Sequence, residues 1–390
     1  MKENKLVIAA AGSGKTTYLV RTALSQMAPV LITTFTNENE LEIRSKFVKL
    51  NGCVPSNVTI QTWFSFLLQH GVRPYQATYN KVLSDYHVSG IHLVNERSGL
   101  KYYTRRGTKE VPIYYKEEDN FFKYYFDKDK KIFTDKIARF VCRSNEASNG
   151  KVIQRMSEIF PSIYIDEVQD LAGYDLEILK ALFQCKSNII CVGDPRQATF
   201  YTHWEKKFTK YKNGKILQFV EKECNKDRVI IDTTSLSNSH RNNKAICEFS
   251  STLYPQMPIT SPCNCIDCHV DRISHQGIFL IDKDDCDVYM QMYNPIQLRN
   301  NKKEEISDAS QCYNFGKSKG KTFDRVLIYP TVEIKVWLKD RTHVLKDTTK
   351  AKLYVAITRA RYSVAFALTK EECAAISDIT TWHPVTNRFK

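Results

Sequence analysis

The sequence predicts an α/β fold built on parallel sheets, and two motifs carry that prediction. The first is a glycine-rich loop, Ala11–Thr16, which lies between an apolar strand at Lys5–Ala10 and a helix. The second is the strand Ser162–Ile165, which runs directly into the adjacent carboxylates Asp166 and Glu167. A glycine-rich loop can be an ordinary turn, and an Asp-Glu pair is usually solvated surface. Because each motif follows its own strand, the pair is better explained as a site for chemistry.

Together the two motifs predict a site that hydrolyses a nucleoside triphosphate. Backbone N–H groups of such a loop and the N-terminus of the following helix bind phosphates, while the Lys and Thr serve the terminal phosphates and Mg²⁺. The second motif supplies a carboxylate for the metal and a base for water. The candidate nucleotide-binding residues of the loop are Ala11, Gly12, Ser13, Gly14, Lys15, Thr16 and Thr17.

Length and charge favour a polyanionic partner. The chain has 390 residues, enough for two or three domains, and 57 Lys and Arg against 43 Asp and Glu give a formal net charge of +14. A basic excess is typical of nucleic-acid-binding proteins, although other basic proteins share it. No apolar run is long enough to span a membrane, and the chain opens on a strand rather than a signal peptide, which predicts a cytoplasmic protein.

The chain contains twelve cysteines, which is many for a protein expected in a reducing compartment. Most stand singly in apolar segments, as Cys185, Cys191 and Cys247 do, and are predicted to be small core residues. Four potential soft ligands lie close together at Cys263, Cys265, Cys268 and His269. They are a candidate zinc site, but their spacing lacks the paired Cys-x-x-Cys arms of common zinc modules, so ordinary free thiols are the competing interpretation.

Two further strands lead into residues that can bind ligands. The segment Pro29–Asn37 is predicted as a buried strand, with Asn37 capping a helix that begins near Glu38. The segment Val58–Phe66 is a strand that runs into an aromatic turn. Aromatic residues at strand ends usually belong to the core, but at the carboxyl edge of a parallel sheet they lie where ligands of open α/β folds bind. Nucleic-acid bases can stack there.

Later segments add an amide and two arginines. Asn188–Gln197 is a strand followed by a turn that displays Gln197, and an amide near a γ-phosphate can sense its hydrolysis. Arg241 and Arg359 follow in other segments, the second within Tyr354–Arg361. An isolated arginine at a turn is usually a surface ion pair. Two of them downstream of one phosphate site favour a second domain that closes over the nucleotide.

In this order the segments resemble the signature blocks of superfamily 1 helicases of the UvrD/Rep/PcrA type. After the phosphate loop come Thr-Phe-Thr-Asn, Asp-Glu-Val-Gln-Asp, Gly-Asp-Pro-Arg-Gln, Ser-Lys-Gly and Val-Ala-Ile-Thr-Arg-Ala-Arg, which together cover most of the chain. The chain is similar to compact UvrD-like proteins of phage, mobile elements and defence systems, including the helicase subunit of Gabija. The resemblance implies an ATP-hydrolysing DNA helicase with two RecA-like domains on parallel sheets.

The resemblance implies the parts of the hydrolysis site residue by residue. Lys15 and Thr16 would hold the β- and γ-phosphates and Mg²⁺. Asp166 would bind the metal, and Glu167 would activate the attacking water. Three further side chains would contact the γ-phosphate, namely Gln197, Arg241 and Arg359.

The resemblance also implies contacts to the nucleotide base and to DNA. His240 stands where relatives place a tyrosine that stacks on adenine, and Gly320 belongs to the nucleotide-binding set. Adenine selectivity is left open, because no glutamine-containing segment precedes the phosphate loop and Thr322 replaces an expected glutamate. The residues implied to line the single-strand path are Phe35, Thr36, Asn37, Thr62, Phe64, Phe200, Tyr201, Ser318 and Lys319.

The domain organisation of the family can be placed on the chain. The expected parts are residues 1–75 with 152–236 as RecA-like domain 1A, 76–151 as insertion 1B, 237–369 as RecA-like domain 2A, and 370–390 as a tail. The insertion is rich in aromatic and basic residues, which suits a single-strand groove or equally the core of a small domain. The short interval between Arg241 and Lys319 implies that insertion 2B is reduced or absent.

The function implied is an ATP-driven translocase on single-stranded or forked DNA, with RNA left open, that moves 3′ to 5′ and separates strands. The competing function is a sensor gated by ATP and nucleic acid, which signals to an effector such as a nuclease in anti-phage defence and unwinds little. The missing 2B region favours this rival. A subunit that binds nucleotide without turnover is disfavoured, because Lys15, Glu167 and both arginines are present.

Overall fold

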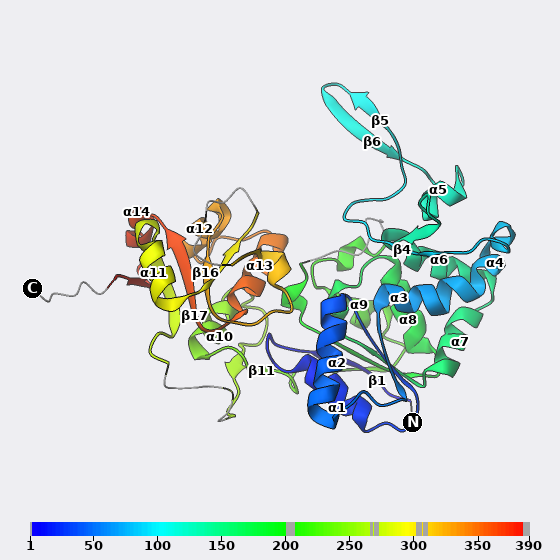
Figure 1. Cartoon of the computed structure of the whole chain (residues 1–390), viewed down its shortest axis with the longest axis horizontal. Coiled ribbons are helices and arrows are strands. Elements are labelled where there is room, and N and C mark those ends of the chain that lie inside the picture. The colour runs from blue at the N-terminus through cyan, green and yellow to red at the C-terminus, as the bar shows by residue number, and fades with distance from the viewer. Residues whose placement is uncertain are drawn as a thin grey trace, which may run out of the picture. The chain divides into compact units, whose positions relative to one another are not determined.

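A computed structural model describes residues 2–199, 207–265, 268, 273–301, 306 and 311–384. These residues divide into two compact units (Figure 1). Unit 1 consists of residues 2–7, 16–193 and 207–232. Unit 2 consists of the loop Ile8–Lys15, the turn Asp194–Thr199 and the described residues from Thr233 onward. Each unit contains a parallel sheet of six strands, which confirms the α/β class and is consistent with two RecA-like domains.

The sheet of unit 1 has the strand order β10-β1-β9-β8-β2-β3. Its strands are β1 (Asn4–Ile8), β2 (Val30–Thr34), β3 (Val58–Thr62), β8 (Ser162–Ile165), β9 (Asn188–Gly193) and β10 (Val229–Asp232). Every residue of β2 and of β8 is buried, as expected for parallel strands with helices on both faces. The strands predicted before the two motifs are therefore confirmed, and they lie inside the core.

Helices connect these strands, and α2 begins at a capping side chain. The helices around the sheet are α1 (Lys15–Leu24), α2 (Asn37–Asn51), α7 (Lys151–Ile159), α8 (Tyr174–Gln184) and α9 (Ile216–Glu223), with 3-10 turns η4 (Val168–Asp170) and η6 (Thr209–Tyr211). The prediction that Asn37 caps α2 is wrong by one residue. The hydroxyl of Thr36 accepts a hydrogen bond from the N–H of Asn39 at 3.1 Å, so Asn37 is already helical.

A long insertion separates β3 from α7. Its elements are α3 (Trp63–Phe66), η1 (Leu67–Val72), η2 (Arg73–Tyr75), α4 (Gln76–Tyr79), η3 (Lys81–Leu83), β4 (Gly90–His92), β5 (Leu100–Arg106), β6 (Lys109–Tyr114), α5 (Phe121–Tyr125), β7 (Lys131–Phe133) and α6 (Thr134–Ala147). Some of its aromatic residues form a core. Tyr125 and Phe140 are fully buried, their rings are 5.2 Å apart, and Tyr79 packs on both.

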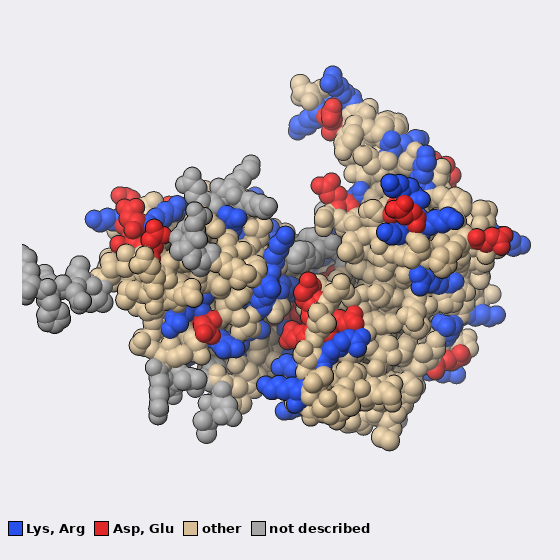
Figure 2. Space-filling view, in the orientation of Figure 1, with Lys and Arg blue, Asp and Glu red and all other residues tan. Residues whose placement is uncertain are grey.

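The other aromatic residues of the insertion lie on an exposed hairpin. Strands β5 and β6 pair with each other in an antiparallel two-stranded sheet, and Gly107 has a positive φ of 63° in the two-residue turn between them. The hairpin stands away from the rest of unit 1 (Figure 1), and Lys and Arg side chains gather over it (Figure 2). The core interpretation is therefore confirmed for one part of the insertion, whereas contact of the exposed hairpin with a single strand stays a prediction.

The sheet of unit 2 has the strand order β15-β14-β16-β17-β13-β18. Its strands are β13 (Gly277–Asp282), β14 (Ile296–Arg299), β15 (Cys312–Asn314), β16 (Phe323–Ile328), β17 (Ala360–Leu368) and β18 (Thr380–Trp382). The remaining elements are η5 (Pro195–Gln197), α10 (Lys244–Ser251), η7 (Lys283–Asp285), α11 (Cys286–Tyr293), η8 (Phe315–Ser318), α12 (Val332–Lys339), α13 (Asp347–Ile357), α14 (Lys370–Ala374) and a small parallel pair, β11 (Asn238–Ser239) with β12 (Ser261–Pro262).

The segment expected as a tail after residue 370 contributes to this unit. Thr369 and Glu372 form a reciprocal capping box at the start of α14, and β18 pairs with β13 at the edge of the sheet. Trp382 is buried there. The boundary expected at residue 370 therefore does not mark the end of the sheet. Among the helices of the described residues, none has the length and apolar character of a membrane span.

Candidate functional site

The motifs singled out in the sequence follow neighbouring strands of the unit 1 sheet. Strand β1 leads into the glycine-rich loop, β9 leads into the turn that contains Gln197, and β8 leads into Asp166. These three strands are adjacent, and β2 and β3 come next in the sheet. Parallel strands end at the same edge, which is where ligands of open α/β sheets bind. The topology thus gives the predicted motifs a common sheet edge.

The glycine-rich loop has the conformation and the free donors that an anion requires. Gly12 and Gly14 have φ values of 72° and 85°, which glycine adopts without strain. Helix α1 begins at Lys15, so the N–H groups of its first turn have no partner within the helix. Ser13 is 3% exposed, and among the described residues its hydroxyl has no hydrogen-bond partner. These features fit a phosphate group.

Gly12 also permits a close approach to the segment that carries Arg241. A Cβ atom added to Gly12 would lie 2.7 Å from the Cβ of Arg241 and 2.7 Å from the Oγ of Ser239. The N–H of His240 donates to the carbonyl of Gly12 at 2.9 Å, and the N–H of Ala10 donates to the carbonyl of Leu236 at 2.8 Å. All of these residues belong to unit 2, where the loop and the Arg241 segment pack together.

The carboxylate motif has a constrained backbone. The N–H of Asp166 donates to the carbonyl of Thr33 at 2.8 Å, and Oδ1 of Asp166 accepts the N–H of Glu167 at 2.9 Å. Glu167 has a φ of 56°, a left-handed conformation that is uncommon outside glycine and tends to occur at functional sites. The side-chain amide of Gln169 donates to the Glu167 carboxylate. The direction of the Glu167 side chain is therefore set by its backbone and by a neighbour.

A buried ion pair fixes the turn after β9. Arg196 is 4% exposed, and its Nε donates to Oδ1 of Asp194 at 2.7 Å. Oδ2 of Asp194 accepts from the amide of Gln197 at 2.9 Å and from the hydroxyl of Tyr354 at 3.2 Å. Burial alone would lower the pKa of Arg196, but the adjacent Asp194 carboxylate, together with Tyr354 and Tyr254, outweighs burial and raises it. Arg196 is therefore charged, and the pair fixes the position of Gln197.

Gln197 is hydrogen-bonded to one of the two predicted arginines. Nη2 of Arg359 donates to Oε1 of Gln197 at 3.1 Å, and its Nε donates to the carbonyl of Val355 at 3.1 Å. Arg241 donates from Nη1 to the carbonyl of Thr358 at 3.2 Å. All of these residues lie in unit 2. The structure therefore joins the amide and the two arginines that the sequence singled out separately.

Sequence reasoning did not find the Asp194, Arg196 and Tyr354 network. The available signal was the Asp-Pro-Arg-Gln block directly after an apolar strand, because charged residues at that place need partners if they are buried. The sequence-based prediction includes only Gln197 from this block. It likewise includes only Arg359 from the segment that begins at Tyr354.

The residues expected along the DNA path are placed unevenly. The rings of Phe35 and Phe64 are half-buried and lie edge to face with centroids 5.7 Å apart, and Thr36 and Asn37 are exposed. The hydroxyl of Thr62 is used within the chain, where it caps α3 by accepting the N–H of Ser65 at 3.3 Å.

Ser318 and Lys319, expected along the DNA path, and Gly320, expected at the nucleotide, lie in unit 2. Ser318 is fully buried and donates to the carbonyl of Phe315 at 2.7 Å, whereas Lys319 is half-buried and Gly320 is exposed. Phe200 and Tyr201 lie outside the described residues.

Three members of the predicted zinc set, Cys263, Cys265 and Cys268, lie together with His240. Nδ1 of His240 lies 3.4 Å from the Sγ of Cys268 and 3.7 Å from the Sγ of Cys265. His269 lies outside the described residues. His240 faces these thiols, and its contact with adenine stays a prediction.

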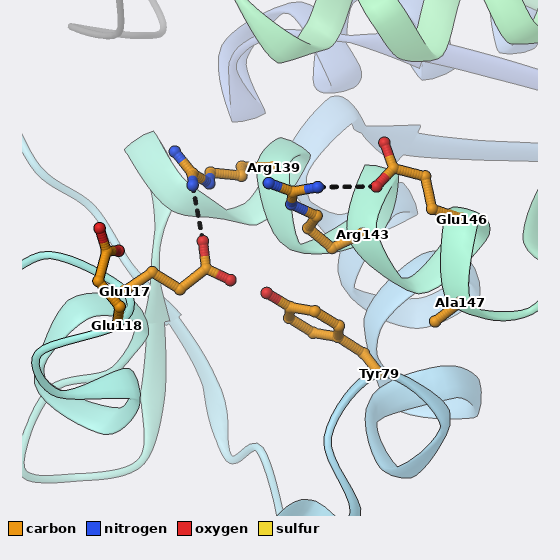
Figure 3. A pocket seen from close by; sticks show the side chains of 7 residues that line it. All are labelled: Tyr79, Glu117, Glu118, Arg139, Arg143, Glu146 and Ala147. Carbon is orange, nitrogen blue, oxygen red and sulfur yellow. Dashed lines mark hydrogen bonds and ion pairs between the residues drawn. The ribbon is translucent and has the colours of Figure 1, made fainter.

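A separate hollow lies within the insertion of unit 1. It has a volume of about 630 Å³ and is lined by Tyr79, Glu117, Glu118, Arg139, Arg143, Glu146 and Ala147 (Figure 3). Arg139 pairs with Glu117 at 2.7 Å and Arg143 pairs with Glu146 at 2.9 Å. Because both arginines are already paired and glutamates line the rest, this hollow does not suit a polyphosphate.

Comparisons with known proteins agree with the strand-end motifs. A family model described as UvrD/REP helicase N-terminal domain matches residues 1–139 and 114–203, which together make residues 1–203. No curated protein sequence matches the chain. Three similar solved structures are arterivirus nonstructural protein 10 (helicase), a complex of that helicase with DNA, and the PRRSV helicase, each 12% identical.

These structures align with 96% of this chain and with 62%, 63% and 54% of their own chains, at TM-scores of 0.43, 0.44 and 0.41. This chain therefore spans less than two thirds of their length. The family model covers more than half of the 390 residues, from before the glycine-rich loop to beyond Gln197. The protein accordingly belongs to the UvrD/REP helicase family.

Proposed function

We propose that the protein hydrolyses ATP and uses the energy to move 3′ to 5′ along single-stranded DNA and to separate strands. The observation that carries the proposal is the contact network of unit 2, in which Gly12 packs on Arg241 and Arg359 bonds to Gln197. An amide and two arginines beside a glycine-rich loop are the groups that phosphoryl transfer needs for charge stabilisation.

The phosphates would be held by the loop and the start of α1. The N–H groups of residues 12 to 14 and the Lys15 ammonium would bind the β- and γ-phosphate oxygens. The hydroxyl of Thr16 and the carboxylate of Asp166 are hard oxygen donors of the kind that Mg²⁺ prefers, so they would hold the metal. Bound Mg²⁺ would neutralise charge on the phosphate oxygens.

Water activation would fall to Glu167. Its carboxylate accepts a hydrogen bond from Gln169, which orients it. A carboxylate held in this way can take a proton from the attacking water. Arg241 and Arg359 would stabilise the charge that develops on the transferred phosphoryl group.

The Gln197–Arg359 bond suggests how hydrolysis is coupled to movement. A guanidinium that bonds to a neutral amide exchanges it readily for a phosphate oxygen, because charge-assisted hydrogen bonds are stronger. Binding of ATP would therefore release Gln197 from Arg359, and loss of the γ-phosphate would restore the bond. This exchange gives the Gln197–Arg359 contact two states that report on the nucleotide, while the Asp194–Arg196 pair holds the turn itself.

The competing function is a sensor gated by ATP and nucleic acid, with an effector such as a nuclease in anti-phage defence. One observation favours it. Between Arg241 and Lys319 the described residues form only α10, α11, η7, η8 and strands β12 to β15, which leaves no room for a further domain among them. A compact UvrD-like chain, resembling the helicase subunit of Gabija, would then signal closure with little unwinding.

The deciding experiment measures the ATPase rate of the full chain with and without single-stranded DNA or RNA, and fork unwinding in both polarities. We expect an ATPase stimulated by single-stranded DNA and unwinding of a fork with a 3′ tail. Stimulated hydrolysis without unwinding would favour the sensor. Glu167→Gln is the control, because it keeps the shape of the side chain but removes the base. An unstimulated wild type, or turnover by Glu167→Gln near the wild-type rate, would overturn the assignment.

A further inference from the structure

Two short strands of unit 2 bring His240 beside a cysteine. Strand β11 pairs in parallel with β12, and Ser239 lies opposite Pro262. The next residues along these strands are His240 and Cys263, and the N–H of Cys263 donates to the carbonyl of Ser239 at 2.9 Å. The backbone ladder therefore fixes His240 and Cys263 side by side, although they are far apart in the sequence.

Two more thiols complete a group of four ligand atoms. Nδ1 or Nε2 of His240 and the Sγ atoms of Cys263, Cys265 and Cys268 all lie within 4.8 Å of one another. In a tetrahedral site with the usual Zn–S and Zn–N lengths, neighbouring ligand atoms are roughly 3.5–3.8 Å apart. The distances from His240 Nδ1 to the sulfurs of Cys268 and Cys265, 3.4 and 3.7 Å, already match that spacing.

The group differs from the remaining cysteines in its surroundings. Cys263 is buried, Cys268 is half-buried, and Cys265 and His240 are exposed, so the ligands form a shallow site that an ion can enter. Cys191 and Cys247, in contrast, are both buried in the core. Three thiolates and one imidazole are a ligand set typical of structural zinc, and soft sulfur ligands select zinc over the hard ions Mg²⁺ and Ca²⁺.

We propose that His240, Cys263, Cys265 and Cys268 bind one zinc ion, and that the ion fixes the turn that presents Arg241. His240 is the residue immediately before Arg241, and its own N–H donates to the carbonyl of Gly12 at 2.9 Å. A metal on the side chain and a hydrogen bond on the backbone would hold His240 at both ends. Arg241, packed on Gly12, would then be held in place beside the phosphate loop.

The two parts of this inference have different foundations. The metal site rests on the geometry of four side chains alone. The effect on Arg241 rests on the proposed ATP hydrolysis, in which Arg241 must be positioned to stabilise charge on the phosphoryl group. Loss of zinc should therefore reduce turnover, while nucleotide binding by the loop at Lys15 should persist.

The first test is metal analysis of the full chain, freshly purified under reducing conditions. We expect about one equivalent of zinc per chain, and Co²⁺ exchanged into the site should give the visible absorption of a tetrahedral thiolate complex. Cys265→Ser and His240→Ala should lose the metal. Cys53→Ser and His87→Ala, which alter exposed residues outside the group, should keep it. Zinc absent from the wild type, or unchanged in Cys265→Ser and His240→Ala, would overturn the site, as would a mass showing disulfides among the three cysteines.

The second test compares turnover with nucleotide binding before and after zinc is removed by a chelator. We expect kcat to fall by about tenfold or more, as for other groups that orient a functional residue, while Kd for a fluorescent ATP analogue stays within about threefold. Added zinc should restore kcat in the wild type but not in Cys265→Ser, and thermal unfolding and retained ATP binding would show that the variant is folded. An unchanged kcat in zinc-free protein would overturn the positioning role. Zinc binding in a wild type without any ATPase would instead overturn the proposed function and leave the metal site intact.

Discussion

The hairpin β5–β6 and the turn η5 both bring cations close to aromatic rings, but in opposite surroundings. On the hairpin, Tyr102 and Tyr103 are 53% and 59% exposed, and the Lys101 ammonium lies 5.9 Å from the Tyr102 ring. At the turn, the guanidinium of Arg196 lies 5.1 Å from the ring of the fully buried Tyr354. It also forms an ion pair with a carboxylate that no solvent reaches.

The difference separates charges that can change partners from charges that cannot. An exposed cation above a ring gains only about 0.5–1 kcal/mol, so it can leave the ring for a passing phosphate. A buried guanidinium cannot leave without stranding a buried carboxylate that has no counter-ion, and such an unpaired charge costs several kcal/mol. The hairpin is therefore suited to reversible contact with a polyanion, and the turn is suited to holding fixed geometry around Gln197.

The largest effect is expected for Arg359→Ala, because this buried guanidinium bonds to Gln197 of the turn η5. The Arg359 guanidinium would stabilise the transition state of hydrolysis more than bound ATP, so turnover should fall roughly a thousandfold or more while ATP affinity stays within about tenfold. Steady-state ATPase rates and nucleotide titration measure both. The matched control is Arg361→Ala, which removes an exposed arginine paired with Asp324 at 3.4 Å. Similar losses in both variants would show that Arg359 acts only as part of a basic surface.

Arg196→Ala should destabilise unit 2 rather than slow one chemical step. It leaves the Asp194 carboxylate buried without its counter-ion, and the free energy of unfolding should fall by about 3–5 kcal/mol. Urea denaturation followed by intrinsic fluorescence measures it. Arg143→Ala, which breaks an exposed pair with Glu146, should cost at most about 1 kcal/mol. Equal losses for the two variants would contradict the contrast between buried and exposed pairs.

A smaller effect is expected on the hairpin, for the double variant Tyr102→Ala/Arg105→Ala. Single-stranded DNA affinity should fall by about 1–3 kcal/mol from lost stacking, and the salt slope should decrease by about 0.7 for the lost phosphate contact. Fluorescence anisotropy at several salt concentrations measures both, and the unfolding midpoint should not change. Lys210→Ala, an exposed lysine paired with Glu223, is the control. An unchanged slope in the double variant would mean that the hairpin does not touch the strand.

The last effect concerns pH and the buried ring of His70 in unit 1. Burial, with a smaller contribution from Arg155, lowers the pKa of His70 from 6.5 to about 4. The unfolded chain therefore binds a proton that the folded chain excludes, so this contribution to stability is complete above pH 6.5 and decreases as the pH falls toward 4. In His70→Phe the free energy of unfolding, measured by urea denaturation at several pH values, should depend less on pH over that range. A variant that keeps the wild-type pH dependence would assign the effect to another group.

Much of the sheet and its strand-end motifs could be predicted from sequence, because short apolar runs and adjacent motif residues are local signals. The strand predicted at Ser162–Ile165 is β8 with the same bounds. The start of α2 was missed by one residue because Thr36 and Asn37 are both good capping residues, and only geometry decides between them.

The long-range arrangements could not be predicted. Strands β11 and β12 have two residues each, too few to give a periodic pattern, so the pairing that brings His240 to Cys263 leaves no signal in the sequence. The burial of Asp194 and Arg196 was hidden for another reason. Charged residues are usually exposed, and their partners Thr260 and Tyr354 come from distant segments.

The left-handed backbone of Glu167 means that stability and the proposed hydrolysis favour different residues at this position. A non-glycine residue held there costs of order 1 kcal/mol or more, which glycine would relieve. Glu167→Gly should therefore fold at least as well as the natural chain and hydrolyse nothing. A library screened only for thermostability would drift toward that change, whereas a screen for turnover would reject it. Glu167 is thus a position at which stability-guided engineering of this chain would remove the proposed base.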